Sequence, residues 1–408
     1  MATPHQELSE ALRIGLIGCG GISRAHVKGL QMLKEAGVCN LEFTACQDIV
    51  LENAKKRATE IAAVQGKEPS VYSSLDEMLE KEDSVRAVDI CTDHLTHHSV
   101  ALKCLEARKH VLIEKPLAIT IRAGRMIVDA AKRNGRTLAV AENYRRMPAN
   151  RAINWCIRTG KIGKPRALMW IETSYNLFYW GWRHHRVKAG GGWILDGGVH
   201  FADLFLYNLG PVDEVYAVTK FNEPIRYEDW PATSKAQAAD VEDLSFATLK
   251  FSSGVAGFWG WSSSAPGKGL NHRIIHGDKG SISWNDGLAL TGAGNTGLYT
   301  ASLNELTRQM LQELGDQEKS IIFPGGIGTK TDAWNFDTSV AVELWDFADS
   351  VTNHRRPEVD GELGLKDEAI SMSVYESATL GEPVKVSEIE SGETAHYQEE
   401  INSAIGLE

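Results

Sequence analysis

The chain contains 408 residues, more than one ordinary hydrophobic core accommodates, so two domains are expected. Hydrophobic residues make up 43% and charged residues 24%, the mixture of a soluble globular protein. The formal net charge of −11 argues against a nucleic-acid partner, because such a surface needs clustered positive charge. No run approaches about 18 apolar residues and residues 1–10 hold no apolar signal core, so we expect no membrane segment.

The six cysteines include no C-x-x-C pair, and several, such as Cys91, lie inside apolar runs. A buried, reduced thiol is the ordinary state of such a residue. We therefore expect neither a disulfide framework nor a structural zinc site, and we expect a cytoplasmic protein.

Short apolar runs alternate with helical patterns through the first third of the chain. Such alternation predicts βαβ units and a doubly wound parallel sheet, whose strands are apolar throughout because both faces are buried. The expected strands cover residues 12–17, 41–46, 85–91, 110–113 and 137–142, and the expected helices cover residues 23–36, 52–65, 97–107 and 121–134. We assign residues 1–147 to this first domain.

After residue 148 strand-like runs follow one another directly, which predicts an α+β domain with a large, mostly antiparallel open sheet. The expected strands cover residues 167–174, 212–221, 244–251, 254–262 and 273–276, with a hairpin turn at 277–280. Helices at 333–351 and 363–380 are expected to cover one face of this sheet. We assign residues 148–384 to the second domain and residues 385–408 to a polar tail, either an arm or a loose segment.

A glycine-rich turn follows the first strand and reads G-x-G-x-x-S. Glycines permit a tight turn and close approach of a pyrophosphate, and the helix start beyond them offers free N–H groups. A structural turn is the alternative, because such patterns also occur for steric reasons. Its position at the start of a βαβ series favours a Rossmann dinucleotide site formed by Gly18, Gly20, Gly21, Ile22 and Ser23.

Asp48 ends the second expected strand, where a carboxylate would accept hydrogen bonds from the adenosine ribose. A carboxylate there repels a 2′-phosphate, so NAD is favoured over NADP. The alternative interpretation is an ordinary N-cap for the following helix.

Four further motifs occur in the order found in one known family. They are Thr92-Asp93-His94-Leu95-Thr96-His97, Glu114-Lys115-Pro116, Asn143-Tyr144-Arg145-Arg146-Met147-Pro148, and the segment from Gly190-Gly191-Gly192 through Asp196 and His200 to Asp203. Over residues 12–384 the chain resembles the Gfo/Idh/MocA family, the glucose–fructose oxidoreductase and inositol dehydrogenase group. In place of the family's Pro-Asn, this chain has Asp93-His94.

The resemblance implies a Rossmann domain, an α/β domain with a large open sheet, and assembly into homodimers or homotetramers. It also implies catalytic roles for Lys115, Asp196 and His200. We further expect cofactor contacts from Thr92, His97, Glu114, Lys115, Asn143 and Arg145.

The chemistry of these residue types agrees with such roles. Asp196 and His200 are four apart, so a helix would place them on one face, where the carboxylate raises the basicity of the imidazole. His200 would exchange the hydroxyl proton as general acid/base, and Lys115 would stabilise developing alkoxide charge. Asp196 would orient His200 and bind substrate. The pair supplies only two metal ligands, and no third is evident nearby, so we expect no catalytic metal.

Aromatic and basic residues precede the glycine run, and their rings suit the C–H faces of a sugar. We expect substrate contacts from Tyr144, Trp182, Arg183, Asp196 and His200, although a tryptophan-rich core or subunit interface explains the aromatic cluster equally well. Insertions around 222–240 and 285–330 favour a bulkier substrate, such as a glycoside.

These features favour NAD-dependent oxidation of a ring secondary hydroxyl of a sugar or glycoside, with C3 the favoured position. One alternative is an NAD-dependent glycosidase, which oxidises the ring transiently, eliminates the aglycone, adds water and returns the hydride. A lesser alternative is a non-catalytic dinucleotide sensor. Such a protein is expected to have lost the lysine or the histidine, and both are present.

Overall fold

The computed structural model describes residues 11–291, 298–329 and 334–407. These residues form two compact units. The first takes in the chain up to Glu114 together with residues 126–146 and 314–361, and the second takes in residues 115–125, 147–313 and 362 onward. One of these crossings lies between Arg146 and Met147, one residue before the expected division after residue 147, and the assignment of residues 1–147 and 148–384 to domains stays a prediction. The return of residues 314–361 to the first unit was not predicted.

A six-stranded parallel sheet forms the centre of the first unit, in the order β3-β2-β1-β4-β5-β6. The strands are β1 (Leu12–Ile17), β2 (Leu41–Gln47), β3 (Ser70–Tyr72), β4 (Ala87–Ile90), β5 (His110–Glu114) and β6 (Leu138–Ala141). The predicted doubly wound parallel sheet is confirmed. The strand order reverses beside β1, and ligands bind at such a switch point in open α/β sheets.

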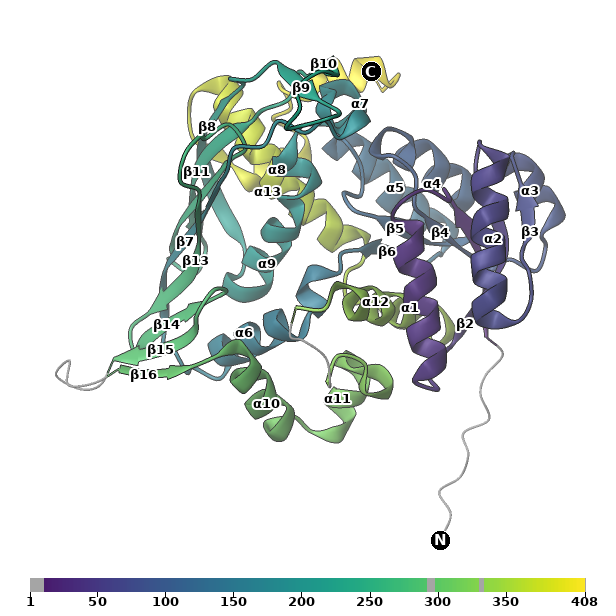
Figure 1. Cartoon of the computed structure of the whole chain (residues 1–408), viewed down its shortest axis with the longest axis horizontal. Helices are drawn as coiled ribbons and strands as arrows, with labels where there is room; N and C mark the ends of the chain where they lie inside the picture. The colour runs from purple at the N-terminus through teal and green to yellow at the C-terminus, as the bar shows by residue number, and fades with distance from the viewer. Residues whose placement is uncertain (1–10, 292–297, 330–333, 408) are drawn as a thin grey trace, which may run out of the picture. The chain divides into compact units, whose positions relative to one another are not determined.

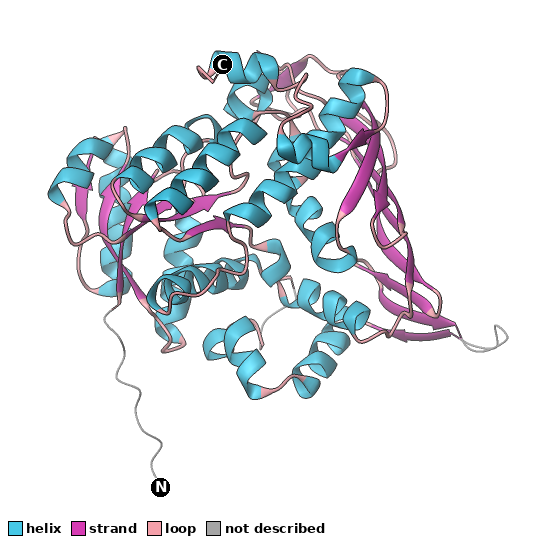
Figure 2. Ribbon diagram, turned by 180° about the vertical axis from the view of Figure 1, so that it is seen from behind, coloured by secondary structure: helices cyan, strands magenta, loops and turns pink. Residues whose placement is uncertain are grey.

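Helices cover this parallel sheet (Figure 2). They include α1 (Ser23–Glu35), α2 (Leu51–Gln65), α3 (Leu75–Lys81), α4 (His97–Glu106) and α12 (Phe336–Thr352), and α5 (Ile121–Asn134) spans the crossing at residue 126. The first unit also contains α11 (Asp316–Ile322). The short strand β3 and helix α3 were missed. Both are too brief to give a clear hydrophobic period.

Helix α12 belongs to the first unit, so the prediction that it covers the second sheet is wrong. It packs on α1, and a Cβ placed on Gly29 of α1 would lie 2.9 Å from Leu344 Cδ1. Its buried Leu344 and Phe347 share a core with Ile14 and Leu30. The hydrophobic period predicts that a helix has a buried face, but it does not identify the surface that covers this face.

The second unit holds a nine-stranded sheet in the order β16-β15-β14-β13-β7-β12-β11-β8-β17. The strands are β7 (Pro165–Thr173), β8 (Val212–Lys220), β11 (Leu244–Phe251), β12 (Ala256–Ser262), β13 (Leu270–Gly277), β14 (Gly280–Ser283), β15 (Gly287–Thr291), β16 (Leu298–Ala301) and β17 (Val384–Lys385). All neighbours are antiparallel except β7 and β12, which confirms the predicted open, mostly antiparallel sheet. A separate hairpin joins β9 (Ile225–Tyr227) and β10 (Ala236–Ala238).

Helices α8 (Trp193–Asp196), α9 (Val199–Leu209) and α13 (Gly361–Leu380) lie along one face of the nine-stranded sheet (Figure 1). Trp170 of β7 packs on Phe201 and Phe205 of α9, with ring centroids 4.4 and 5.4 Å apart. The unit also contains α6 (Pro148–Arg158), α7 (Arg186–Ala189) and α10 (Leu303–Glu313).

The segment after Val384 is packed, so of the two expected states, an arm or a loose segment, the loose segment is wrong. It forms α14 (Val386–Ser391) and α15 (Glu399–Ala404), and Ile389 and Ile401 are fully buried. The Gln398 side chain accepts a hydrogen bond from Ile121 N at 2.8 Å, and Asn402 accepts one from Thr120 Oγ1 at 2.7 Å. Some of the polar residues that suggested an exposed tail therefore form buried hydrogen bonds instead. Over the described ranges, no helix combines the length and apolarity needed to span a bilayer.

Candidate active site

The run Gly190-Gly191-Gly192 leads into α8, and its backbone is enclosed by two large side chains. A Cβ on Gly191 would lie 2.5 Å from Tyr375 Cζ, and a Cβ on Gly192 would lie 2.6 Å from Glu242 Oε2. Real Cβ atoms do not approach other atoms so closely, so glycine is required at both positions. The sequence pattern thus reflects how tightly Tyr375 and Glu242 hold the chain just before α8.

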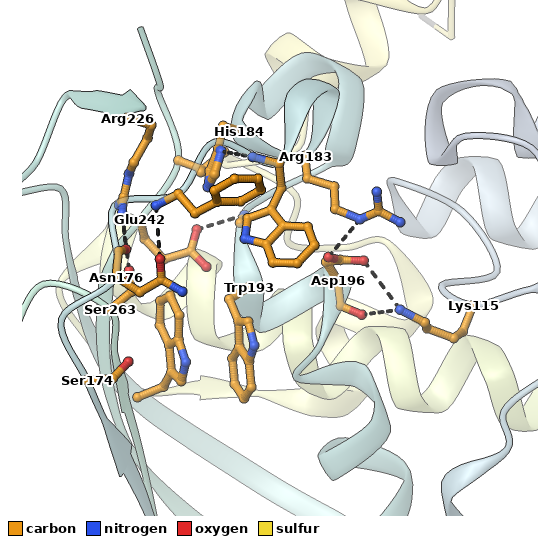
Figure 3. Close-up of a pocket in the computed structure, with 15 residues that line it drawn as sticks. Lys115, Ser174, Asn176, Arg183, His184, Trp193, Asp196, Arg226, Glu242 and Ser263 are labelled. Carbon is orange, nitrogen blue, oxygen red and sulfur yellow. Dashed lines mark hydrogen bonds and ion pairs between the residues drawn. The ribbon is translucent and has the colours of Figure 1, made fainter. Parts of the chain in front are cut away.

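Asp196, at the end of α8, lies between two cations (Figure 3). The Lys115 ammonium donates to the Asp196 backbone oxygen at 2.6 Å and approaches Asp196 Oδ1 at 3.3 Å. On the other side Arg183 Nε lies 3.1 Å from Asp196 Oδ2, and the guanidinium stacks over the Trp182 ring at 4.4 Å. The structure therefore brings together three predicted site residues, which come from three separate segments of the chain.

These three residues line a pocket of about 520 Å³, within the range typical of small-molecule sites. Trp193 and Trp261 stack in parallel in its wall, with centroids 4.8 Å apart and planes 2° apart. Phe178 and Trp180 make an edge contact at 5.1 Å and also line the pocket. The wall thus offers flat aromatic faces together with charged groups, which is a suitable surface for a polyhydroxylated ring.

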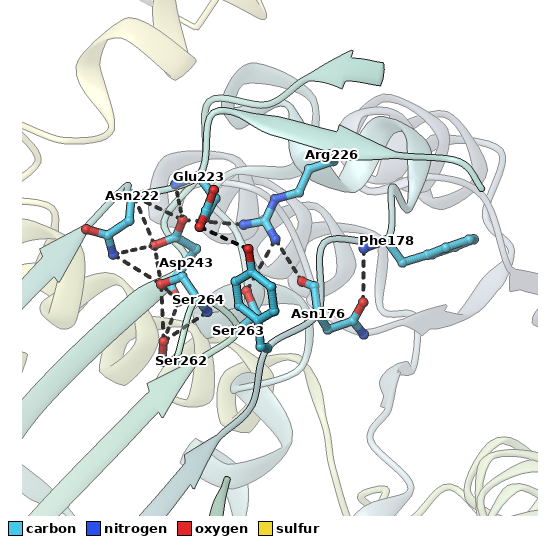
Figure 4. A network of polar contacts seen from close by, with 10 residues as sticks. Asn176, Phe178, Asn222, Glu223, Arg226, Asp243, Ser262, Ser263 and Ser264 are labelled. Carbon is cyan, nitrogen blue, oxygen red and sulfur yellow. Dashed lines mark hydrogen bonds and ion pairs between the residues drawn. The ribbon is translucent and has the colours of Figure 1, made fainter. Parts of the chain in front are cut away.

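Arg226 of β9 lines the same pocket and is anchored behind it (Figure 4). Its guanidinium donates to the Asn176 backbone oxygen at 2.9 Å and lies 3.5 Å from Asp243 Oδ2. Asp243 is fully buried and accepts backbone bonds from Asn222 and Glu223. Sequence analysis placed an insertion at 222–240 but missed this anchor, because its partners meet only in the folded chain.

His184 also lines the pocket, and its pKa is lowered to about 4, mainly by burial and then by the neighbouring Arg226 charge. The imidazole is therefore neutral near pH 7. It accepts a hydrogen bond from Trp180 N at 3.1 Å. His184 therefore acts in the site as a neutral acceptor that holds the backbone at Trp180.

His200 is buried in the first turn of α9. Gly197 and Gly198 separate α8 from α9, so the expected single helix carrying Asp196 and His200 is instead two short helices. In the part of the chain that the structure describes, His200 and Trp182 do not line the pocket. Their catalytic and substrate roles stay predictions.

In the first unit the glycine-rich turn leads directly into α1. Gly18 has φ +83°, and a Cβ there would lie 2.7 Å from the Cys91 backbone oxygen, so glycine is required. At Gly20 and Gly21 a Cβ would meet no described atom within 4 Å. Ser23 Oγ donates to the Gly20 backbone oxygen at 2.8 Å, and the N-cap Ile22 provides no side-chain cap. The helix start therefore remains open to an anion, as the predicted dinucleotide site requires.

Asp48 follows β2, and its carboxylate already has local partners. Oδ2 accepts from Cys19 N at 2.8 Å, and Oδ1 accepts from Val50 N at 2.8 Å. These bonds tie the end of β2 to the glycine-rich turn. The N-cap interpretation is wrong, because the N-cap position of α2 is Val50 and no side chain caps this helix. Asp48 instead supports the turn and the chain before α2, and its contact with the ribose stays a prediction.

Glu114 takes part in a buried network that sequence analysis missed. His26 of α1 contacts Asp89 Oδ2 at 2.7 Å through Nδ1 and Glu114 Oε1 at 3.0 Å through Nε2. Burial acts to lower the pKa of His26, but the charges of Asp89 and Cys91 and the hydrogen bonds to them together outweigh it, so the pKa is raised well above its usual value. An imidazolium thus ties α1 to the ends of β4 and β5, just before Lys115. The sequence signal that could have identified His26 is its position three residues after Ser23, on the buried face of α1.

The remaining predicted cofactor residues also lie in the first unit. Thr92 follows β4, His97 begins α4, and Arg145 lies buried in the short helix Tyr144–Arg146. Asn143 is buried and donates to Ser339 Oγ at 2.8 Å. Tyr144, predicted to bind substrate, is half-buried in the same short helix. These roles stay predictions.

The chain departs from the family pattern at Asp93-His94. Asp93 Oδ1 accepts hydrogen bonds from Thr96 N at 3.1 Å and Thr96 Oγ1 at 2.8 Å, so the aspartate caps the short helix His94–Thr96. A conventional cap therefore forms the turn that the family builds around Pro-Asn.

Comparison with known families and proteins gives a consistent result. The model of the oxidoreductase family with an NAD-binding Rossmann fold matches residues 12–142, and the Gfo/Idh/MocA C-terminal domain model matches residues 151–283. The 1,5-anhydro-D-fructose reductase of Ensifer adhaerens is 27% identical over 93% of this chain and 99% of the reductase. The levoglucosan dehydrogenase of Pseudarthrobacter phenanthrenivorans is 29% identical over 67% of this chain and 73% of its own length.

A solved structure of levoglucosan dehydrogenase in complex with NADH and L-sorbose shares the fold. It covers 93% of this chain and 99% of its own, with 24% identity and a TM-score of 0.76.

Proposed function

Because the chain belongs to the Gfo/Idh/MocA family of oxidoreductases, with an NAD-binding Rossmann domain, we propose that it oxidises a ring secondary hydroxyl of a sugar or glycoside. The favoured position is C3, and NAD is the favoured hydride acceptor. The observation that carries this proposal is one pocket in which Lys115 contacts Asp196 beside stacked indole rings.

The residue roles follow from charge and position. Lys115 binds the reacting hydroxyl and stabilises the negative charge that develops on its oxygen. Asp196 and its backbone oxygen hold the ammonium in place, so that the cation needs little reorganisation during the reaction. His200 exchanges the hydroxyl proton near neutral pH. The bound nicotinamide supplies hydride-accepting chemistry.

The wall of the pocket supports a sugar substrate. Indole faces suit the C–H faces of a pyranose, while the neighbouring arginines and amides offer hydrogen bonds to hydroxyl groups. Two of the relatives above are named for cyclic sugar derivatives, and L-sorbose is bound in one related structure. Both observations favour a sugar or glycoside over an open-chain acid.

A panel of sugars and glycosides with NAD and NADP, followed at 340 nm alongside mass spectrometry of the products, tests the proposal. We expect one NADH for each oxidised sugar. Net hydrolysis with catalytic NAD would instead identify the glycosidase alternative. NAD binding without turnover of any sugar would favour the dinucleotide sensor.

We also propose that the outer face of the nine-stranded sheet joins subunits into a homodimer or homotetramer. One line across the strands pairs Tyr216 with Thr248, Thr248 with Phe258, Phe258 with Met169, and Met169 with Ile274. Tyr216 and Met169 are 44% and 47% exposed, unusually open for large apolar side chains. Sedimentation of the wild type and a Met169→Glu variant tests this; an unchanged mass would contradict it.

The state of the cysteines indicates the kind of cellular compartment in which the protein is expected. All six lie unpaired, five of them buried. This state is the one expected in a reducing compartment, and we therefore include a cytoplasmic location in the proposal.

A further inference from the structure

We propose that Glu242 is a positioning residue whose carboxylate locks α8, and with it Trp193 and Asp196, in the arrangement that the active site needs. The residue lies 46 positions beyond Asp196 in the chain, directly before the buried Asp243, and none of the sequence motifs includes it. It nevertheless lines the pocket beside Trp193.

Both carboxylate oxygens of Glu242 are used to hold the start of α8. Oε2 accepts from Gly192 N at 2.8 Å, and Oε1 accepts from Ile194 N at 3.0 Å and from Tyr375 Oη at 2.9 Å. The four-residue helix that begins at these bonds carries Trp193 at its first position and Asp196 at its last. Because the helix is a single turn, fixing its start fixes both side chains.

Close packing also fixes the position of the chain that leads into α8. Gly191 lies against the Tyr375 ring and Gly192 against the Glu242 carboxylate, too close for any Cβ. Tyr375 is itself held by parallel stacking on Tyr397, with centroids 4.5 Å apart. The glycine run and the Glu242–Tyr375 pair therefore form one interlocking unit.

Three donors point at the Glu242 carboxylate. Because all three need an acceptor, the strength of the lock depends on whether Glu242 is ionised. An ionised Glu242 accepts all three bonds, whereas a protonated Glu242 carries a hydrogen that competes with them. Burial raises the pKa of Glu242 to about 7, and its hydrogen bonds from Ile194, Tyr375 and Gly192 hold it down from a higher value. The lock is therefore half formed at about pH 7, approaches completion at higher pH and is lost as the pH falls further.

The charged and titratable groups named here, which lie around Glu242, do not change their charge near pH 7. Burial raises the pKa of Tyr375 and Tyr397 well above the usual value, so both stay neutral. Burial lowers the pKa of His184 to about 4, so it is also neutral near pH 7. Arg226 faces Asp243 as well as Glu242.

The remaining charges on the pocket wall belong to Lys115, Arg183 and Asp196, and both cations pair with the Asp196 carboxylate.

The test uses tryptophan fluorescence of the full chain between pH 5.5 and 8.5, without cofactor or sugar. We expect a step near pH 7 in the wild type, because the environment of Trp193 changes as the lock forms. Trp193→Phe should lose this step, which identifies the reporter among the eleven tryptophans. Glu242→Gln should lose it as well.

Tyr375→Phe is the decisive variant, because it keeps the ring against Gly191 and removes only the hydroxyl donor. Losing a bond to the charged form raises a carboxyl pKa, so the step should move to higher pH. A step that persists in Glu242→Gln, or a midpoint unchanged in Tyr375→Phe, would overturn the proposal. If Glu242→Gln does not fold, the Tyr375→Phe midpoint decides alone.

The activity readout rests on the proposed function, and the fluorescence readout does not. With an active sugar, KM of the wild type should rise as the pH falls below 7, and this limb should shift with Tyr375→Phe in parallel with the fluorescence. Absence of turnover in the wild type would count against the proposed function, while the fluorescence step would still test the lock.

Discussion

Two glycine runs in this chain look alike as text but are needed for opposite reasons. At Gly20 and Gly21, in the first unit, a Cβ would meet no described atom within 4 Å. At Gly191 and Gly192, in the second unit, a Cβ would overlap Tyr375 and Glu242. The first run therefore keeps space open beside a helix start, where a ligand phosphate is expected, and the second keeps space for the protein's own side chains. Glycine alone does not distinguish a ligand cradle from close internal packing.

The largest expected effect concerns the chemistry beside the second run. Lys115→Met should lower kcat by about 10³-fold, the order expected for loss of a group that stabilises transition-state charge. NAD affinity should fall far less than kcat, because Lys115 is only one of the residues expected to contact the cofactor. Steady-state kinetics and NAD titration check both parts, and normal turnover would show that Lys115 has no catalytic role.

Gly191→Ala should destabilise the protein by about 1–3 kcal/mol, because the new methyl group overlaps the Tyr375 ring. Denaturant unfolding measures this change. Gly21→Ala is the matched control in the other run, and its unfolding free energy should move by less than about 0.5 kcal/mol. Equal destabilisation by the two variants would remove the contrast between the runs.

The same Gly21→Ala variant should weaken NAD binding by about tenfold, equivalent to roughly 1.4 kcal/mol, since its methyl group would enter the space kept for the pyrophosphate. Calorimetric titration with NAD gives the value. Gly191→Ala, examined where it remains folded, should keep NAD affinity. An unaltered NAD affinity in Gly21→Ala would make the first run a structural turn only.

Asp48→Ala should have the smallest effect, a several-fold loss of NAD affinity that exceeds the loss for NADP. The carboxylate supports the turn through Cys19 N in either case, but only NAD gains from its charge near the ribose. Parallel titrations with the two cofactors check the difference. Equal losses would reduce Asp48 to support for the turn and for the start of α2.

The sequence by itself determined the features that depend on neighbouring residues. Apolar runs and their spacing predicted the parallel sheet and its glycine-rich turn, because strand burial and turn geometry are local properties. The motifs around Lys115 and Asp196 identified two groups that do meet, 81 positions apart, with Lys115 Nζ 2.6 Å from the Asp196 backbone oxygen.

Only the tertiary structure decided what surrounds those groups. Glu242 meets Tyr375 across 133 positions, and Arg146 meets Asp346 across 200. Helix α12 packs on α1, and the polar C-terminal segment is partly buried. The hydrophobic period predicts that a helix face is buried, and the hydrogen-bonding capacity of a residue predicts that it bonds to another group. Neither identifies which residue forms the contact. The partner is set by the path of the whole chain.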